Sequence, residues 1–191
     1  MNWSKSKVLT ATTTAKIYGM PSNLTNILNG NLAFRPLPKS VNGVDGPTVN
    51  ALVDRLKAEH AVPKVVAPHL GKIKTAQGGT IDADATLENS APVLFDAVVI
   101  ANGQQSVEAL KKIGMTREYL INTFRHCKTL MLIGDAVSLM DYFHIPKSLP
   151  DNKPDDGLLF PDSLGKDELD KLVKAIAIDR HKARDMDPPL I

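Results

Sequence analysis

Short apolar runs alternate with amphipathic stretches along most of this 191-residue sequence. The runs at 97–101 and 129–133 are apolar almost throughout, as expected for strands that are buried on both faces. In the stretches between and after them, apolar residues recur every three or four positions, which is the period of a helix that buries one face. Such strands, alternating with helices, form a mainly parallel sheet covered on both sides. The pattern therefore predicts an α/β sandwich of three layers.

The remaining elements follow from the same reasoning. A helix is predicted after Pro47, which suits a first turn, and a period-two hairpin is predicted around Gly78 and Gly79. Further strands are predicted within 63–68 and 157–160, and further helices at 106–113, 116–126 and 166–184.

The run at 129–133 breaks at Gly134 and Asp135 before a predicted helix. In several α/β enzyme families a strand-turn-helix of this kind is a nucleophile elbow with Ser or Cys at the turn. Ligands of parallel sheets gather at the carboxyl ends of the strands. We therefore expect the loops 41–46, 101–106 and 133–138 to define any functional site.

Composition excludes several classes of protein. Hydrophobic residues make up 43% of the chain and charged residues 23%, and the net charge of +2 gives no support to a nucleic-acid partner or a membrane surface. The single cysteine, Cys127, excludes an internal disulfide framework and is compatible with a reducing intracellular setting. The five histidines show no metal-ligand spacing, so no metal site is predicted.

The first forty residues differ from the rest, with five basic residues and no Asp or Glu. We interpret them as a strand at 7–14, a short helix near 21–28 and a linker that ends near residue 40. A mitochondrial transit peptide is the alternative, although the segment has only one arginine. Residues 185–191 are interpreted as a tail.

Three stretches carry a resemblance to a known family: "APHLG", "GGTIDADATLENSAPVLFDAVVI", and "HCK" ahead of "GD". Together they resemble the C-terminal domain of large-subunit catalases over residues 41–184. The resemblance implies a flavodoxin-like fold of the class I glutamine amidotransferase and PfpI-like superfamily. Such domains usually place a strand immediately before the loop at 41–46, where this chain has "FRPLPKS". In this chain the strand at 7–14 would take the place of that strand in the sheet. Alternatively, residues 1–40 are unrelated to the family.

The resemblance also implies what the chain does. The parent enzyme converts hydrogen peroxide to water and oxygen with haem bound by another domain, so no cofactor is expected in this chain. The domain itself would contribute stability, oligomer assembly or chaperone-like protection. Its expected partners are the catalase core domain or subunits, further copies in a homo-oligomer, and unfolded client proteins.

For the site residues, the resemblance places a Cys followed by His at the elbow of PfpI-like relatives, with an acid from the first helix. The matching positions here are Gly134 and Asp135, and the acid position falls near Thr48. Asp135 is a candidate base or nucleophile, but we expect its carboxylate to cap the following helix. Cys127 is the other candidate, and it precedes the strand at the end opposite the elbow, as a structural thiol would. The interpretation is that the chain has no catalytic residues.

Two alternatives stay open at this point. One is a stand-alone PfpI-like hydrolase or glyoxalase-type enzyme that uses Asp135 or Cys127. The other is a truncated product in which the first forty residues replace the haem domain. Asp141 and His144 lie one helical turn apart, but the sequence offers no evident serine partner for a hydrolytic triad.

Overall fold

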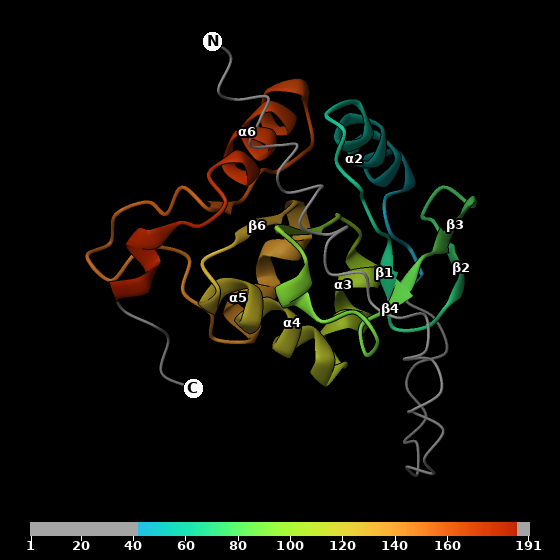
Figure 1. The fold of residues 1–191 in the computed structure, drawn as a ribbon. Coiled ribbons are helices and arrows are strands. Elements are labelled where there is room, and N and C mark those ends of the chain that lie inside the picture. The colour runs from blue at the N-terminus through green and yellow to red at the C-terminus, as the bar shows by residue number, and fades with distance from the viewer. Residues whose placement is uncertain (1–41, 187–191) are drawn as a thin grey trace.

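A computed structural model describes residues 42–186 of the chain, and Figure 1 shows their arrangement. Three parallel strands form the central sheet: β5 (Ala97–Ile100), β6 (Thr129–Leu132) and β7 (Leu158–Leu159). β6 lies in the middle, with Ala97 opposite Thr129 on one side and Leu130 opposite Leu158 on the other. The predicted parallel sheet of apolar strands is confirmed.

A second group of strands precedes this sheet in the sequence. β1 (Val66–Ala67) pairs in parallel with β4 (Ala85–Thr86), and β2 (Gly71–Lys74) pairs in antiparallel with β3 (Thr80–Ala83). The β2–β3 turn contains Gly78 at a φ of 85°, a conformation that glycine adopts without strain. The hairpin predicted around Gly78 and Gly79 is confirmed.

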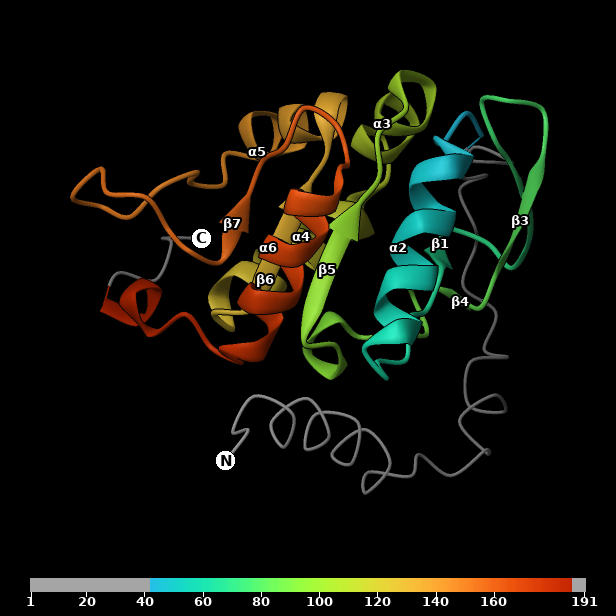
Figure 2. The ribbon, with the colours of Figure 1, turned by 90° about the horizontal axis from the view of Figure 1, so that it is seen from above.

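Helices cover both faces of the sheet, as Figure 2 shows. α2 (Gly46–Ala58) and α6 (Lys166–Ala177) lie on one face. On the other face lie α3 (Gln104–Lys111), α4 (Gly114–Arg125) and α5 (Ser138–Tyr142). Three short 3₁₀ helices complete the described elements: η2 (Pro92–Leu94), η3 (Gly134–Val137) and η4 (Lys182–Met186).

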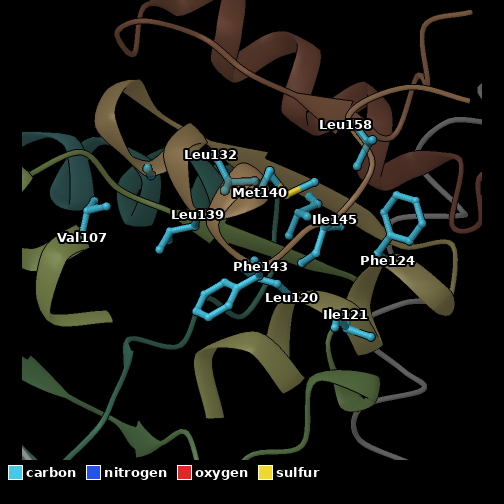
Figure 3. Close-up of a cluster of buried hydrophobic side chains, with 12 residues drawn as sticks. Val107, Leu120, Ile121, Phe124, Leu132, Leu139, Met140, Phe143, Ile145 and Leu158 are labelled. Carbon is cyan, nitrogen blue, oxygen red and sulfur yellow. The ribbon is translucent and has the colours of Figure 1, made fainter. Parts of the chain in front are cut away.

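The alternating side chains of β6 supply the core on both faces. Leu130 and Leu132 are fully buried among residues of α4 and α5, in the cluster drawn in Figure 3. Met131 points to the opposite face, where it packs with Leu52 of α2 and Leu172 of α6. Because a strand sends successive side chains to opposite faces, one apolar run holds both helical layers.

The last helix is shorter than predicted. It ends at Ala177, not at residue 184, and Asp179 then adopts a φ of 69° that a helix does not accommodate. The chain turns and forms η4 instead, so Arg184 lies in a separate short helix.

The predictions for a strand at 7–14, a helix near 21–28, a linker and a tail fall wholly or largely outside residues 42–186. No helix in the described part of the chain is long and apolar enough to cross a membrane.

Candidate functional site

Three loops meet at the carboxyl edge of the sheet, as the sequence predicts. The backbone N–H of Asp45 donates a hydrogen bond to the carbonyl oxygen of Asn102, 2.9 Å away, which joins the first loop to the loop after β5. Gly103 has a φ of 140°, and a Cβ there would lie 2.3 Å from the carbonyl oxygen of Gly43. Only glycine permits this approach, so the close contact depends on residue 103 lacking a side chain.

The side chain of Asn102 links the same loop to the elbow. Its Oδ1 accepts hydrogen bonds from the backbone N–H of Gly103 at 2.8 Å and of Asp135 at 3.1 Å. Gly134 has a φ of 55°, and a Cβ on it would lie 2.8 Å from the Asn102 side chain. The backbone amide at the turn is therefore satisfied by a protein oxygen, whereas an oxyanion site needs amides that are aimed at a developing charge.

A small pocket of about 220 Å³ lies beside the elbow. Its lining has no histidine, lysine or cysteine, and its hydroxyl group, that of Ser138, donates to the carbonyl oxygen of Asp135 at 2.7 Å. The carboxylate of Glu108, also in the lining, pairs with Lys111 at 2.6 Å. A serine nucleophile requires an adjacent general base, whereas the hydroxyl of Ser138 donates its proton to a backbone carbonyl oxygen.

Asp135 does not cap a helix, contrary to the sequence prediction. It is the second residue of η3, whose N-cap position is Ile133, and the N-cap position of α5 is Val137. Neither cap makes a side-chain hydrogen bond. Capping requires the polar residue to precede the helix, and the helical turn here begins one residue before Asp135. Its exposed carboxylate therefore faces solvent.

The position expected for an acid is occupied by Thr48, which holds a nearby carboxylate. Its hydroxyl donates to one oxygen of Asp45 at 2.5 Å, and the side-chain amide of Gln77 donates to the other at 2.8 Å. Asp45 was not singled out from the sequence, although it precedes a helix as capping residues do. One oxygen therefore fixes the loop to α2 and the other fixes it to the β2–β3 turn.

The structure separates Cys127 from the elbow. Cys127 comes before β6 and Gly134 comes after it, so the two lie at opposite ends of this strand. The cysteine is 2% exposed, and its sulfur contacts the carbonyl oxygen of Arg125 at 3.7 Å. It also adopts a φ of 55°, within the tight turn between α4 and β6.

The other titratable candidates have structural partners. Asp141 forms an ion pair with Lys147 at 2.7 Å, and the exposed His144 bonds to Asp141 only through its backbone. Among residues 42–186, no group of three or more His, Cys, Asp or Glu side chains is placed to hold a metal ion.

One buried charged pair was not anticipated from the sequence. Arg184 donates from Nε and Nη2 to the two oxygens of Asp155, at 2.6 and 2.9 Å, and from Nη1 to the carbonyl oxygens of Phe124 and Lys128. Burial opposes ionisation of Asp155, but the hydrogen bonds and the attraction of Arg184 outweigh it and hold the pKa of the carboxyl below its usual range. The pair fastens η4 to the end of the sheet that carries Cys127.

A larger cavity lies elsewhere, between β1 and β5. It measures about 1480 Å³ and is lined mostly by aliphatic side chains of α2, β1 and β5. Its residues include no histidine, cysteine or methionine. Tyrosine also ligates haem in some proteins, and Tyr119 lies in the lining, but its hydroxyl is 3.3 Å from Ser90 Oγ and burial raises the pKa of its phenol. The cavity therefore does not fit a haem.

Comparisons with known proteins identify relatives of two kinds. The family described as the C-terminal domain found in long catalases matches residues 39–185. Catalase HPII of Pseudomonas putida is 27% identical over 135 residues, which cover 71% of this chain and 17% of that protein. Catalase C of Rhizobium meliloti strain 1021 is 30% identical over 102 residues, covering 53% of this chain and 14% of that protein. The chain thus spans less than a fifth of these relatives.

A solved structure supports the fold. The ThiJ/PfpI domain protein of Brachyspira murdochii superposes with a TM-score of 0.58 at 17% identity, over 72% of this chain and 92% of that one. This likeness establishes the flavodoxin-like architecture predicted from the sequence.

Proposed function

The chain belongs to the family of C-terminal domains found in long catalases, and we propose that it is a non-catalytic accessory domain of such an enzyme. In this role the peroxide chemistry and the haem belong to a catalase core. The domain contributes stability to the assembled enzyme through contacts with that core or with further copies of itself.

The observation that carries the proposal is the elbow. The turn after β6 presents Gly134 and Asp135, with no thiol or histidine in the adjacent pocket. The amide of Asp135 is already bonded to Asn102. An elbow without a nucleophile, and with its amide occupied, supports a structural role for this edge of the sheet.

The surface supports an assembly role. Val62, Leu94 and Ile178 line the large cavity and are 64%, 50% and 52% exposed. Large apolar side chains that stay exposed are typical of a surface that another segment or protein covers. The same surface would let the domain hold partly unfolded proteins, which is the chaperone-like form of the proposal.

The test is an assay of the full chain for turnover. Purified protein should give no haem absorption band, no breakdown of hydrogen peroxide, and no conversion of methylglyoxal or of a peptide panel. A reaction that is lost in Asp135→Asn or in Cys127→Ser would overturn the proposal and identify a PfpI-like enzyme. Thr48→Ala is the matched control, because it changes the loop without touching either candidate.

A further inference from the structure

The large cavity separates two halves of what would otherwise be one sheet. β5 lies on one side of it and β1 on the other, and α2 closes it on one face (Figure 2). Protein interiors are packed as densely as organic crystals, with few voids larger than a water molecule. A cavity of about 1480 Å³ among aliphatic side chains is far larger than such a void.

The strand edges that face the cavity are open. In the part of the chain that the structure describes, β5 pairs only with β6, and β1 pairs only with β4. β5 and β6 are both apolar, yet all four residues of β6 are buried and all four of β5 are half-buried. The difference follows from the missing neighbour, since a strand inside a parallel sheet is covered on both faces and along both edges.

The start of the described chain gives the direction of this missing neighbour. Gly43 donates to the carbonyl oxygen of Lys74 at 2.8 Å, and Asp45 donates to that of Asn102 at 2.9 Å. The chain at 43–45 thus joins the β2–β3 hairpin to the loop at the carboxyl end of β5. A strand that leads directly from the cavity into residue 43 would run parallel to β5.

The sequence before residue 42 limits which segment this is. The segment that directly adjoins it contains Pro36 and Pro38, and proline cannot donate to the ladder of a central strand. Residues 8–13, "VLTATT", contain no charge, glycine or proline and are rich in β-branched side chains. We propose that residues 8–13 of this chain form a strand that fills the cavity between β1 and β5.

Hydrogen–deuterium exchange on the full chain tests this directly. Residues 8–13 and β5 should both exchange slowly. Leu9→Pro removes an amide donor from the proposed strand, so it should speed exchange in Ala97–Ile100 at least about tenfold. It should also raise the fluorescence of an apolar dye that enters the opened cavity. Ala33→Pro is the matched control, because it breaks the apolar run at 32–34, and it should change neither signal.

Four results would overturn the proposal. The first is free exchange of residues 8–13 in the unsubstituted protein, which needs no variant to fold. The second is an unchanged rate of hydrogen–deuterium exchange in β5 of Leu9→Pro. The third is the same loss of protection in Ala33→Pro, which would assign the cavity to residues 31–34. The fourth is protection of β5 that falls on dilution, because the strand would then come from a second copy.

Discussion

The side-chain oxygen of Asn102 lies 3.1 Å from the backbone nitrogen of Asp135 and accepts its hydrogen bond. This contact joins the loop after β5 to the turn after β6, at the place where a flavodoxin-like enzyme would hold its reactive group. The sharp turn after β6 is present, but its backbone amide bonds to a neighbouring loop.

Gly134 is predicted to be required for this connection. Alanine at 134 would keep a positive φ and drive its Cβ against the Asn102 side chain, so Gly134→Ala should cost about 1–3 kcal/mol in the free energy of unfolding. Gly114→Ala is the control, because that glycine has open space around its missing Cβ and no positive φ. Urea denaturation measures both, and equal stability of the two variants would contradict the account.

The buried Asp155–Arg184 pair is predicted to matter more than an exposed pair of the same charge type. Asp155→Ala leaves the guanidinium of Arg184 buried and uncompensated, so the expected loss is about 3–5 kcal/mol in the free energy of unfolding. Asp151→Ala removes the solvent-exposed pair with Lys153 and should leave the free energy of unfolding almost unchanged. Similar losses in the two variants would show that the first pair is not buried in solution.

Stability is predicted to fall in mild acid because of His181. Its Nε2 lies 3.0 Å from the hydroxyl of Thr129, and burial, followed by repulsion from Arg184, lowers the pKa of its imidazole. The unfolded chain therefore binds the proton more readily than the folded protein. The stabilising contribution is complete above about pH 6.5 and is lost as pH falls toward the lowered folded pKa.

Denaturation between about pH 7 and pH 5 checks this. His181→Gln should flatten the decline in the free energy of unfolding, whereas His144→Gln, at an exposed position, should leave it in place. The contribution of Asp155, whose pKa is also lowered, is lost only below about pH 4 and falls outside this window. A decline that persists in His181→Gln would exclude His181 as its cause.

Cys127 is predicted to react slowly with iodoacetamide in the folded protein. At 2% exposure its sulfur is inaccessible to the reagent, and reaction requires local opening of the turn before β6. Labelling in native buffer should therefore be much slower than in denaturant at the same pH. Equal rates in the two conditions would place the thiol on the surface.

The features that leave a local pattern in the sequence could be predicted from it. The apolar strands β5 and β6 and the hairpin at Gly78 were predicted because burial and turn chemistry leave local patterns. The carboxyl-edge loops were predicted to meet because parallel strands end at the same edge. The identity of Gly134 and Asp135 as the elbow followed from the same local reasoning.

Other features depend on contacts between distant residues. Asn102 and Asp135 are 33 residues apart, and Asp155 and Arg184 are 29 apart, so no local period marks either pair. The cap expected from Asp135 was wrong because a 3₁₀ turn begins at Gly134, one residue before the expected cap. The end of α6 was placed too late because the apolar stripe does not reveal the left-handed conformation at Asp179.

The most direct test of the central claim is a domain graft. In a long catalase such as catalase HPII of Pseudomonas putida, the enzyme's own C-terminal domain is replaced by this chain, and peroxide turnover is measured after heating. The account predicts that the graft keeps the initial rate of the truncated catalase core and survives heating better than that core. The Asp155→Ala graft should lose part of this gain. A graft that is inactivated at the same temperature as the core alone would contradict an accessory role in a long catalase.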